Sequence, residues 1–224
     1  GDVSCYDINA GCTGFVDISK IAYLESLIKP EGLVFCCSGD INSKIVNRED
    51  YSLSCVFGDL LNLSIFKLNN KNLKNLYRYE VSFKHYDCIR RENNGNLIMK
   101  GLEVMSFVSD TVLPSLIKYI ESIEQKKLGE YSLILHQANK FIVDFINKKI
   151  KKLYPTLKLH NFCMENIGNS GSSTIPYAIQ KLYLENGLRG KVIVCGYGVG
   201  MSVSIGTFDI PENNSPNNFL ISEI

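Results

Sequence analysis

The sequence predicts an α/β protein made of two similar halves, because the same short pattern occurs twice. The first copy is the corner Gly11-Cys12-Thr13-Gly14, and the second is the corner Gly168-Asn169-Ser170-Gly171. Each corner is followed by apolar residues at helical spacing, then by a glycine, then by an apolar run typical of a buried strand. This repeated order indicates an internal duplication. It predicts that Cys12 and Asn169 lie near a pseudo-twofold axis.

The elements of the first half follow from its apolar periodicity. We expect a buried strand over residues 3–8, a helix over residues 15–28 and a strand over residues 33–37. Two further apolar runs, residues 54–57 and 62–68, are predicted to form paired strands. Two polar breaks follow, a turn over residues 69–75 and a stronger break over residues 93–96.

The second half is expected to open with a long amphipathic helix from Gly101 to about Gln125, which Pro114 interrupts. Strands are predicted over residues 131–135, 157–162, 191–195 and 202–208, and a helix over residues 175–183. A further helix follows the first of these strands and is expected to bury Phe141, Ile142, Phe145, Ile146 and Ile150. The predicted domains are therefore 1–95 and 96–210, with a loosely attached tail over 211–224.

Composition narrows the functional classes. The 224 residues are 45% hydrophobic and 21% charged, with a formal net charge of +1, which gives no indication of nucleic-acid binding. No apolar run is long enough to span a bilayer, so no membrane association is expected. The eight cysteines lack CxxC pairs and metal-ligand spacing. This pattern predicts reduced thiols in a cytoplasmic protein, with no metal site.

Cys12 is the first candidate for chemistry, because it lies between a predicted strand and the start of a predicted helix. The unpaired N–H groups and the positive dipole end of a helix N-terminus favour a thiolate, which is the nucleophilic form of cysteine. The alternative is that Cys12 is a small buried apolar residue, as most free cysteines are.

The two halves differ in the number of strand–helix units that precede their corners. The second half has two strand–helix units ahead of Asn169, whereas the first half begins directly at the strand that carries Cys12. Because parallel strands need neighbours that cover them, this difference predicts that the chain is the C-terminal two-thirds of a longer protein. The alternative is a natural short protein with a lopsided fold.

Four motifs in this order carry a family resemblance: residues 7–15, His136-Gln137-Ala138-Asn139, residues 168–173 and Gly196-Tyr197-Gly198-Val199-Gly200. Over about residues 3–208 the chain resembles 3-oxoacyl-acyl-carrier-protein synthase III, also called beta-ketoacyl-ACP synthase III. The resemblance implies a thiolase-like fold, in which two pseudo-twofold-related βαβαβαββ halves form five α/β/α/β/α layers. The first half would be incomplete in this chain, and the family is usually homodimeric.

The resemblance also implies an activity and its residues. The family initiates type II fatty acid biosynthesis as an acyltransferase, by decarboxylating Claisen condensation of an acyl-CoA with malonyl-acyl carrier protein. Cys12, His136 and Asn169 would be catalytic, and the backbone N–H groups of Cys12 and Val199 would hold the oxyanion. No cofactor is implied beyond these substrates.

Alternatives remain at each position. His136 alone is typical of a satisfied core histidine, and Asn169 alone of a turn or N-cap residue. Lys148, Lys149 and Lys152 are typical of a solvated helix face, although basic charge would also suit docking of an acidic carrier protein.

Two departures from the family pattern keep the activity itself open. Phe141 stands where the family commonly has an arginine, and Leu60 follows Phe57-Gly58-Asp59 where the family often has glycine. The alternatives are a specialised synthase III-like acyltransferase of another pathway, or a chain that is inactive without a separate N-terminal fragment.

Overall fold

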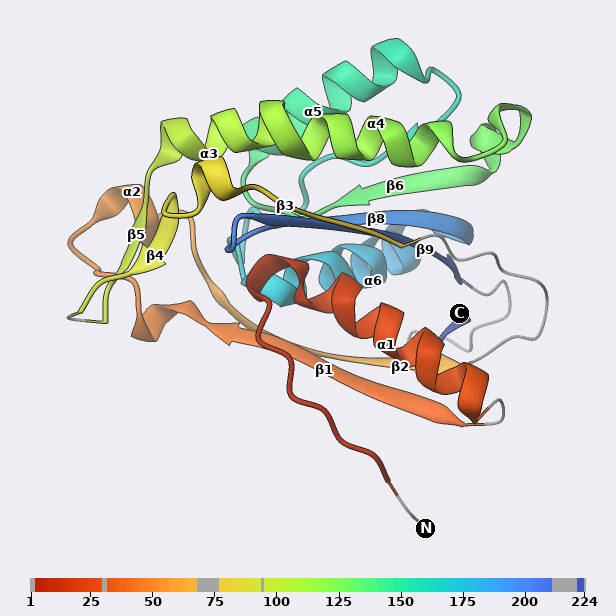
Figure 1. Ribbon diagram of the computed structural model, residues 1–224, viewed down its shortest axis with the longest axis horizontal. Coiled ribbons are helices and arrows are strands. Elements are labelled where there is room, and N and C mark those ends of the chain that lie inside the picture. The colour runs from red at the N-terminus through yellow and green to blue at the C-terminus, as the bar shows by residue number, and fades with distance from the viewer. Residues whose placement is uncertain (1–2, 30–31, 68–76, 94, 211–220, 224) are drawn as a thin grey trace.

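The computed structural model describes residues 3–29, 32–67, 77–93, 95–210 and 221–223. Helices and strands alternate in layers of the order α/β/α/β (Figure 1). The outermost helices cover one face of the molecule, and they are α3 (Gly101–Phe107), α4 (Leu113–Glu121) and α5 (Lys140–Leu153). Two helices, α1 (Gly14–Ile28) and α6 (Thr174–Asn186), lie between the two strand layers and contact strands of both. Among the described residues, no helix has the length and apolar character needed to cross a bilayer.

The strands of the second half form the inner strand layer. Strand β8 (Gly190–Gly198) is central, with β6 (Tyr131–Leu135) parallel on one side and β9 (Ser202–Ile210) antiparallel on the other. β7 (Lys158–Leu159) pairs in parallel with β6, and β3 (Arg78–Val81) pairs antiparallel with β9. Helices cover both faces of the middle of this layer, so β6, β8 and β9 are buried along most of their length.

The first half contributes an antiparallel pair, β1 (Leu33–Ile41) and β2 (Asp59–Lys67), in the register Leu33↔Lys67 to Ile41↔Asp59. Successive strand side chains point to opposite faces. The inner face packs against α1 and α6 through residues such as Cys36 and Phe66. The outer face is apolar and open, since Phe35 is 63% exposed and Leu61 is 76% exposed.

The predicted duplication is visible in the order of elements. In the first half, the 3-10 turn η1 (Gly11–Thr13) leads into α1, β1 and the antiparallel strand β2. In the second half, the 3-10 turn η6 (Gly171–Ser173) leads into α6, β8 and the antiparallel strand β9. The two turns contact each other, which brings the two predicted corners together at the centre of the molecule.

Two strand predictions in the first half were wrong. Residues 3–8 lie in an irregular, mostly exposed segment, because no strand of the described chain lies beside them to accept a ladder of hydrogen bonds. The run over residues 54–57 instead follows a helical turn, α2 (Tyr51–Ser54). The Asp50 carboxylate caps that turn by accepting a hydrogen bond from the backbone N–H of Ser52, at 3.0 Å.

The long helix of the second half is interrupted as predicted, but it ends earlier. A π-helical turn, η4 (Val108–Val112), separates α3 from α4 just before Pro114. Proline lacks the N–H that an α-helix needs at this point, so the hydrogen-bond ladder shifts there. The helix ends at Glu121 rather than near Gln125. The strand predicted over residues 157–162 is reduced to β7.

The tail forms a strand in part, which corrects the expectation of loose attachment. β10 (Ile221–Glu223) lies between β2 and β9, parallel to the first and antiparallel to the second, and so satisfies backbone groups of both. Residues 211–220 and 224, and the predicted turn over 69–75, lie outside the described residues. The domain division remains a prediction, and the hairpin of β4 (Ile89–Arg91) and β5 (Leu97–Met99) spans the proposed boundary.

Candidate active site

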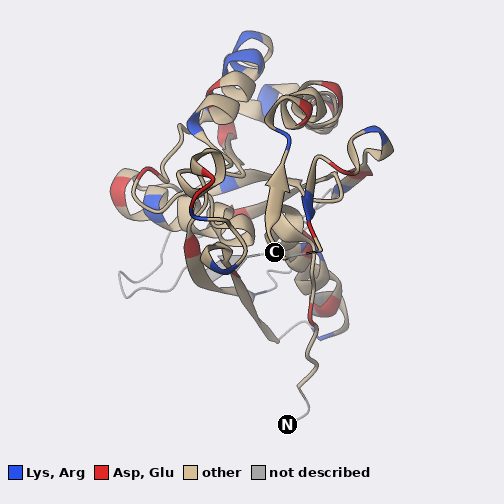
Figure 2. Cartoon of the chain, turned by 90° about the vertical axis from the view of Figure 1, so that its left-hand side faces the viewer, with Lys and Arg blue, Asp and Glu red and all other residues tan. Residues whose placement is uncertain are grey.

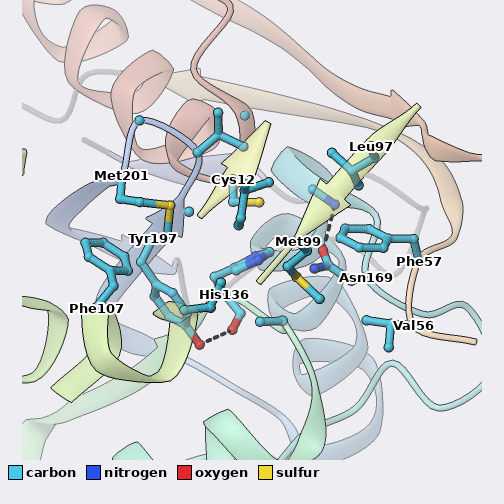
Figure 3. A pocket seen from close by; sticks show the side chains of 18 of the residues that line it. Cys12, Val56, Phe57, Leu97, Met99, Phe107, His136, Asn169, Tyr197 and Met201 are labelled. Carbon is cyan, nitrogen blue, oxygen red and sulfur yellow. Dashed lines mark hydrogen bonds between the residues drawn. The ribbon is translucent and has the colours of Figure 1, made fainter. Parts of the chain in front are cut away.

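A cavity of about 840 Å³ opens where the two repeats meet, and residues of both halves line it. Cys12, His136 and Asn169 all line this cavity, and so does Val199. In Figure 3 the sulfur of Cys12, the ring of His136 and the amide of Asn169 face the space between them. The structure thus brings together the residues that the sequence singled out in three separate motifs.

Cys12 is held against strand β8 by two glycines. A β-carbon on Gly196 would stand 2.8 Å from the carbonyl oxygen of Cys12, and one on Gly198 would stand 3.0 Å from its sulfur. Real side chains do not approach this closely, so the position of Cys12 depends on glycine at both sites. Gly11 precedes the thiol with a φ of +51°, which favours glycine as well.

The chemistry of the thiol differs from the expectation. Burial raises the pKa of Cys12 to about 12, and the nearby Asp40 carboxylate adds to this rise. This contradicts the prediction that the helix N-terminus favours a thiolate, since removal from water outweighs the lowering of the pKa by a backbone hydrogen bond. A pKa in this range favours the thiol form of Cys12 at physiological pH.

Asp40, at the end of β1, joins the two corners. Its carboxylate accepts hydrogen bonds from the backbone N–H and the hydroxyl of Ser172, both at 2.8 Å. It lies so close to Gly171 that a β-carbon there would overlap with it. Asp40 therefore fixes the start of η6 and α6 relative to the first half.

His136 directly follows β6, and hydrogen bonds of its backbone and a ring contact fix its position. Its backbone N–H donates to the carbonyl of Cys195 at 2.8 Å, and its own carbonyl accepts from the Tyr197 hydroxyl at 3.0 Å. Its ring stands edge-on to Tyr197, with centroids 5.2 Å apart. The residue is only 1% exposed, and this burial lowers the pKa of the imidazole to about 3. The ring is neutral at physiological pH.

Asn169 is held through its backbone by the loop before β2. Its N–H donates to Val56 at 2.7 Å, and its carbonyl accepts from the backbone of Gly58 at 3.0 Å and the amide of Asn42 at 3.2 Å. In the side chain, Oδ1 accepts from the N–H of Gly171 at 3.0 Å. This bond orients the amide so that its NH₂ group can donate into the cavity. Asn169 is thus a turn residue as well as a member of the site.

The walls around the three polar groups are mostly apolar. They come from both halves and include Ile45, Val56, Phe57, Leu97, Met99, Phe107 and Met201. Val199 lies in the turn between β8 and β9 at the edge of the cavity and is 44% exposed. Such a wall excludes water and suits an apolar acyl chain.

The first turn of helix α5 borders the cavity, and the lysines of the helix lie farther along it. Phe141 lines the cavity but is 68% exposed, so the prediction that it is buried in the core was wrong. It occupies the first turn of α5, where the helix borders the cavity. Lys148, Lys149 and Lys152 are exposed farther along the helix, which carries the uppermost blue bands in Figure 2.

One cluster among the described residues has the composition of a metal site. Ligand atoms of Asp87, Cys88 and Glu103 lie within 4.8 Å of one another. The ammonium of Lys100 already lies 2.7 Å from Asp87 and 3.5 Å from Glu103. This cation balances the carboxylates, so the cluster is better described as an ion-paired support for the start of α3 than as a metal site.

The residues that support the candidate site were not identified from the sequence. Asp40, Asn42 and Thr174 carry no motif of their own. Only the folded chain shows that Asp40 bonds Ser172, Asn42 bonds Asn169 and Thr174 contacts His136. Gly58 had a visible signal in Phe57-Gly58-Asp59. A β-carbon on it would overlap the carbonyl of Ile167, which precedes the Asn169 corner.

Comparisons with known proteins show what the chain is similar to in sequence. Residues 131–210 match the family model described as 3-Oxoacyl-[acyl-carrier-protein (ACP)] synthase III C terminal. The chain is 27% identical over 222 residues to the beta-ketoacyl-[acyl-carrier-protein] synthase III of Clostridium novyi (strain NT), covering 89% of this chain and 65% of that one. It is 27% identical over 211 residues to the enzyme of that name from Acholeplasma laidlawii (strain PG-8A), covering 90% and 64%.

Solved structures show the same fold. The 3-oxoacyl-(acyl-carrier protein) synthase of Burkholderia xenovorans LB400 matches with a TM-score of 0.81 at 19% identity, over 96% of this chain and 66% of that one. The priming beta-ketosynthase of the R1128 polyketide biosynthetic pathway matches with a TM-score of 0.80 at 18% identity, over 92% and 65%.

The chain therefore has a thiolase-like fold. In sequence, the family model over residues 131–210 and the curated relatives show a similarity to 3-oxoacyl-acyl-carrier-protein synthase III. The chain spans 65% of the length of the Clostridium novyi relative.

Proposed function

We propose that this protein catalyses the decarboxylating condensation of an acyl-CoA with malonyl-acyl carrier protein, giving a 3-oxoacyl-acyl carrier protein. The single observation that carries the proposal is that Cys12, His136 and Asn169 line one apolar cavity. A nucleophile and two neutral hydrogen-bond donors are the groups that this chemistry needs.

In the first half-reaction, the sulfur of Cys12 attacks the thioester carbonyl of the acyl-CoA. The C–S bond to CoA breaks, the acyl group is left on Cys12, and the proton of the thiol ends on the sulfur of CoA. The backbone N–H groups of Cys12 and Val199 are the proposed donors to the oxyanion. Donors fixed in advance by η1 and by the β8–β9 turn stabilise that charge without reorganisation.

In the second half-reaction, the malonyl thioester loses CO₂, and the electron pair of the broken C–C bond forms an enolate. His136 and Asn169 are the proposed donors to the enolate oxygen. Both are neutral, since burial lowers the pKa of His136 to about 3 and an amide does not titrate. Because both donors are neutral, the site does not have to bury an uncompensated positive charge before the enolate forms. The enolate carbon then attacks the acyl group on Cys12, the C–S bond to Cys12 breaks, and the released thiolate takes up a proton from solvent to regenerate the thiol.

The carrier protein is the proposed partner of α5. Lys148, Lys149 and Lys152 are exposed on this helix, whose first turn borders the cavity. A basic surface farther along the helix that begins at the cavity would attract an acidic carrier protein to this side of the molecule.

The outer face of β1 and β2 supports a second proposal, that a separate polypeptide covers it. Leu33, Phe35 and Ile41 of β1 and Leu61 of β2 are all more than half exposed on this face. Large contiguous apolar patches on a sheet mark an interface or lead to aggregation. We propose that a separate fragment completes the first half and that the chain alone is inactive. Its test is the mass and composition of the complex that the chain forms when it is isolated from its native cells.

The alternative function is that of a specialised synthase III-like acyltransferase, which uses another acyl donor in another pathway. Phe141 and Leu60, at positions where the family commonly has arginine and glycine, favour it. A panel of acyl-CoA donors of different chain length, each assayed with malonyl carrier protein, would distinguish the two.

The decisive experiment incubates the active assembly with radiolabelled acyl-CoA and follows the label. We expect the protein to become labelled, Cys12→Ser to abolish the label, and His136→Ala and Asn169→Ala to keep it. The same two alanine variants should fail to release CO₂ from malonyl carrier protein. Equal labelling of wild type and Cys12→Ser would show that the nucleophile is a different residue.

A further inference from the structure

The carboxylate of Asp17, in the first turn of α1, joins the turn that carries Cys12 to a strand of the second half. Its Oδ1 accepts a hydrogen bond from the hydroxyl of Ser204 in β9 at 2.7 Å. Its Oδ2 accepts one from the hydroxyl of Thr13, the residue next to Cys12, also at 2.7 Å. Thr13 is fully buried and Ser204 is 3% exposed, so bulk water hardly competes for these two hydroxyls.

The protons of both hydroxyls are directed at Asp17. The Thr13 hydroxyl also lies 3.0 Å from the carbonyl of Ala10, but it has only one proton to give. A carboxylate has acceptors only, and a bond to a charged acceptor is the stronger one, so the proton goes to Asp17. The carbonyl of Ala10 keeps the backbone N–H of Thr13 as a donor at 3.3 Å. Neither hydroxyl nor the Ala10 carbonyl is then without a partner.

The bond to Ser204 adds a constraint that close packing does not provide. Ser204 lies opposite Gly196 in the β8–β9 ladder, and a β-carbon on Gly196 would stand 2.8 Å from the carbonyl oxygen of Cys12. This contact limits how near η1 comes to the sheet, but it does not fix where along the strands the turn lies. A hydrogen bond has a preferred length and direction, so the bond from Ser204 to Asp17 fixes that second coordinate.

We propose that Asp17 is a positioning residue for Cys12, which fixes the turn η1 to strand β9 and so sets where the sulfur meets the acyl carbonyl. The inference rests on the proposed function for its consequence, because acyl transfer is the step that needs a precisely placed sulfur. Asp17 is not among the described residues that line the cavity, so it acts through Thr13 and η1 rather than on a substrate. Neither Asp17 nor Ser204 belongs to the motifs that carry the family resemblance.

The first test follows the turn itself and needs no activity. Amide hydrogen exchange of the peptide over residues 10–17 is measured by mass spectrometry on the full chain at pH 7. Asp17→Ala removes both acceptors, and the exchange of this peptide should become at least about fivefold faster. Ser204→Ala breaks the tie from the other side and should act in the same direction, which keeps the test open if Asp17→Ala does not fold. Unchanged exchange in both variants would overturn the inference.

Two further variants separate the tie from general loosening. Asp17→Asn keeps an oxygen that accepts from Ser204, and its NH₂ group can donate to the oxygen of Thr13, so wild-type exchange is expected. Tyr119→Phe removes a different buried contact of β9, the one of 2.7 Å between the hydroxyls of Tyr119 and Thr207. It should leave the exchange of residues 10–17 unchanged. Equal acceleration in Asp17→Ala and Tyr119→Phe would contradict a specific tie.

The second test distinguishes positioning from structural support. In the active assembly, acylation of Cys12 is followed over a range of concentrations of radiolabelled acyl-CoA. Asp17→Ala should lower the rate constant at saturation by about 10- to 100-fold, the usual cost of a displaced reacting group, with the KM for acyl-CoA unchanged. Asp17→Asn should restore most of the rate. Adding Ser204→Ala to Asp17→Ala should cause no further loss, since both break the same tie.

The outcomes of the two tests can be told apart. Acylation by Asp17→Ala at the wild-type rate, or a loss no larger than in Tyr119→Phe, would overturn the positioning role. If the wild type itself does not acylate, the proposed function fails, while the amide exchange still tests the tie between η1 and β9.

Discussion

Gly198, in strand β8, is packed directly against Cys12. A β-carbon on Gly198 would stand 2.9 Å from the β-carbon of Cys12 and 3.0 Å from its sulfur. The end of β8 therefore sets where the sulfur lies, although the two residues are far apart in the sequence.

Gly198→Ala should displace the thiol while the fold is kept. The added methyl group must push Cys12 away, since the strand behind it is buried and cannot yield. We expect acylation by radiolabelled acyl-CoA to fall at least about tenfold, because small displacements of a nucleophile are costly. Gly129→Ala is the control, since its β-carbon would meet only ordinary contacts at 3.8 and 3.9 Å. Equal loss in both variants would contradict this account.

The charge of Asp40 should make Cys12 less reactive than it would otherwise be. The carboxylate helps to raise the pKa of the thiol to about 12, so the thiolate fraction is small and grows with pH. Asp40→Asn keeps the shape and removes the charge, which lowers this pKa. Alkylation of Cys12 by iodoacetamide, followed on its peptide by mass spectrometry, should become about three- to tenfold faster at each pH. Asp59→Asn, on an exposed carboxylate held by Ser43, should alkylate as the wild type does. An unchanged rate in Asp40→Asn would show that burial alone sets the pKa.

His136 should make the fold sensitive to acid. Its pKa is lowered from 6.5 to about 3 on folding, so between these values the unfolded chain binds a proton that the folded chain does not. The free energy of unfolding should therefore fall as the pH drops below about 6.5, by up to about 1.4 kcal/mol per pH unit from this residue. His136→Asn should show a shallower slope in urea unfolding measured at several pH values. Parallel slopes for the two proteins would count against a buried neutral imidazole.

Reversing the lysines of α5 should weaken the encounter with the carrier protein and leave the chemistry intact. The variant Lys148→Glu, Lys149→Glu, Lys152→Glu should raise the KM for malonyl carrier protein by about tenfold at low salt, with a smaller effect at high salt. Labelling by acyl-CoA should not change. The matched control reverses three exposed lysines elsewhere, Lys20, Lys126 and Lys127. An equal rise in KM for both variants would point to net charge rather than to a docking surface on α5.

The features that depend on local sequence patterns were predicted correctly from the sequence. The strand over residues 131–135 and the helix starts after Cys12 and Asn169 follow from apolar periodicity and glycine corners, and the structure has them. The interruption before Pro114 was also predictable, because proline has no N–H to donate. The gathering of Cys12, His136 and Asn169 was expected from the resemblance of three motifs.

The features that the sequence did not reveal depend on distant contacts. Residues 3–8 have the composition of a strand, but a strand exists only beside a partner that pairs with it. The pKa of Cys12 could not be judged from its helix position, since the opposing effect comes from burial and from Asp40 on another strand. Thr174 likewise has no visible link to His136 until α6 is packed behind β6.

The pairing of a thiol from one repeat with an amide from the other has a genetic consequence. The two turns that meet, η1 and η6, occupy equivalent places, yet one provides Cys12 and the other Asn169. A molecule with two identical copies would have two thiols and no amide at these places, or two amides and no thiol. A duplication that produced the two halves therefore requires that their corners diverged afterwards, and neither corner supplies the side chain of the other.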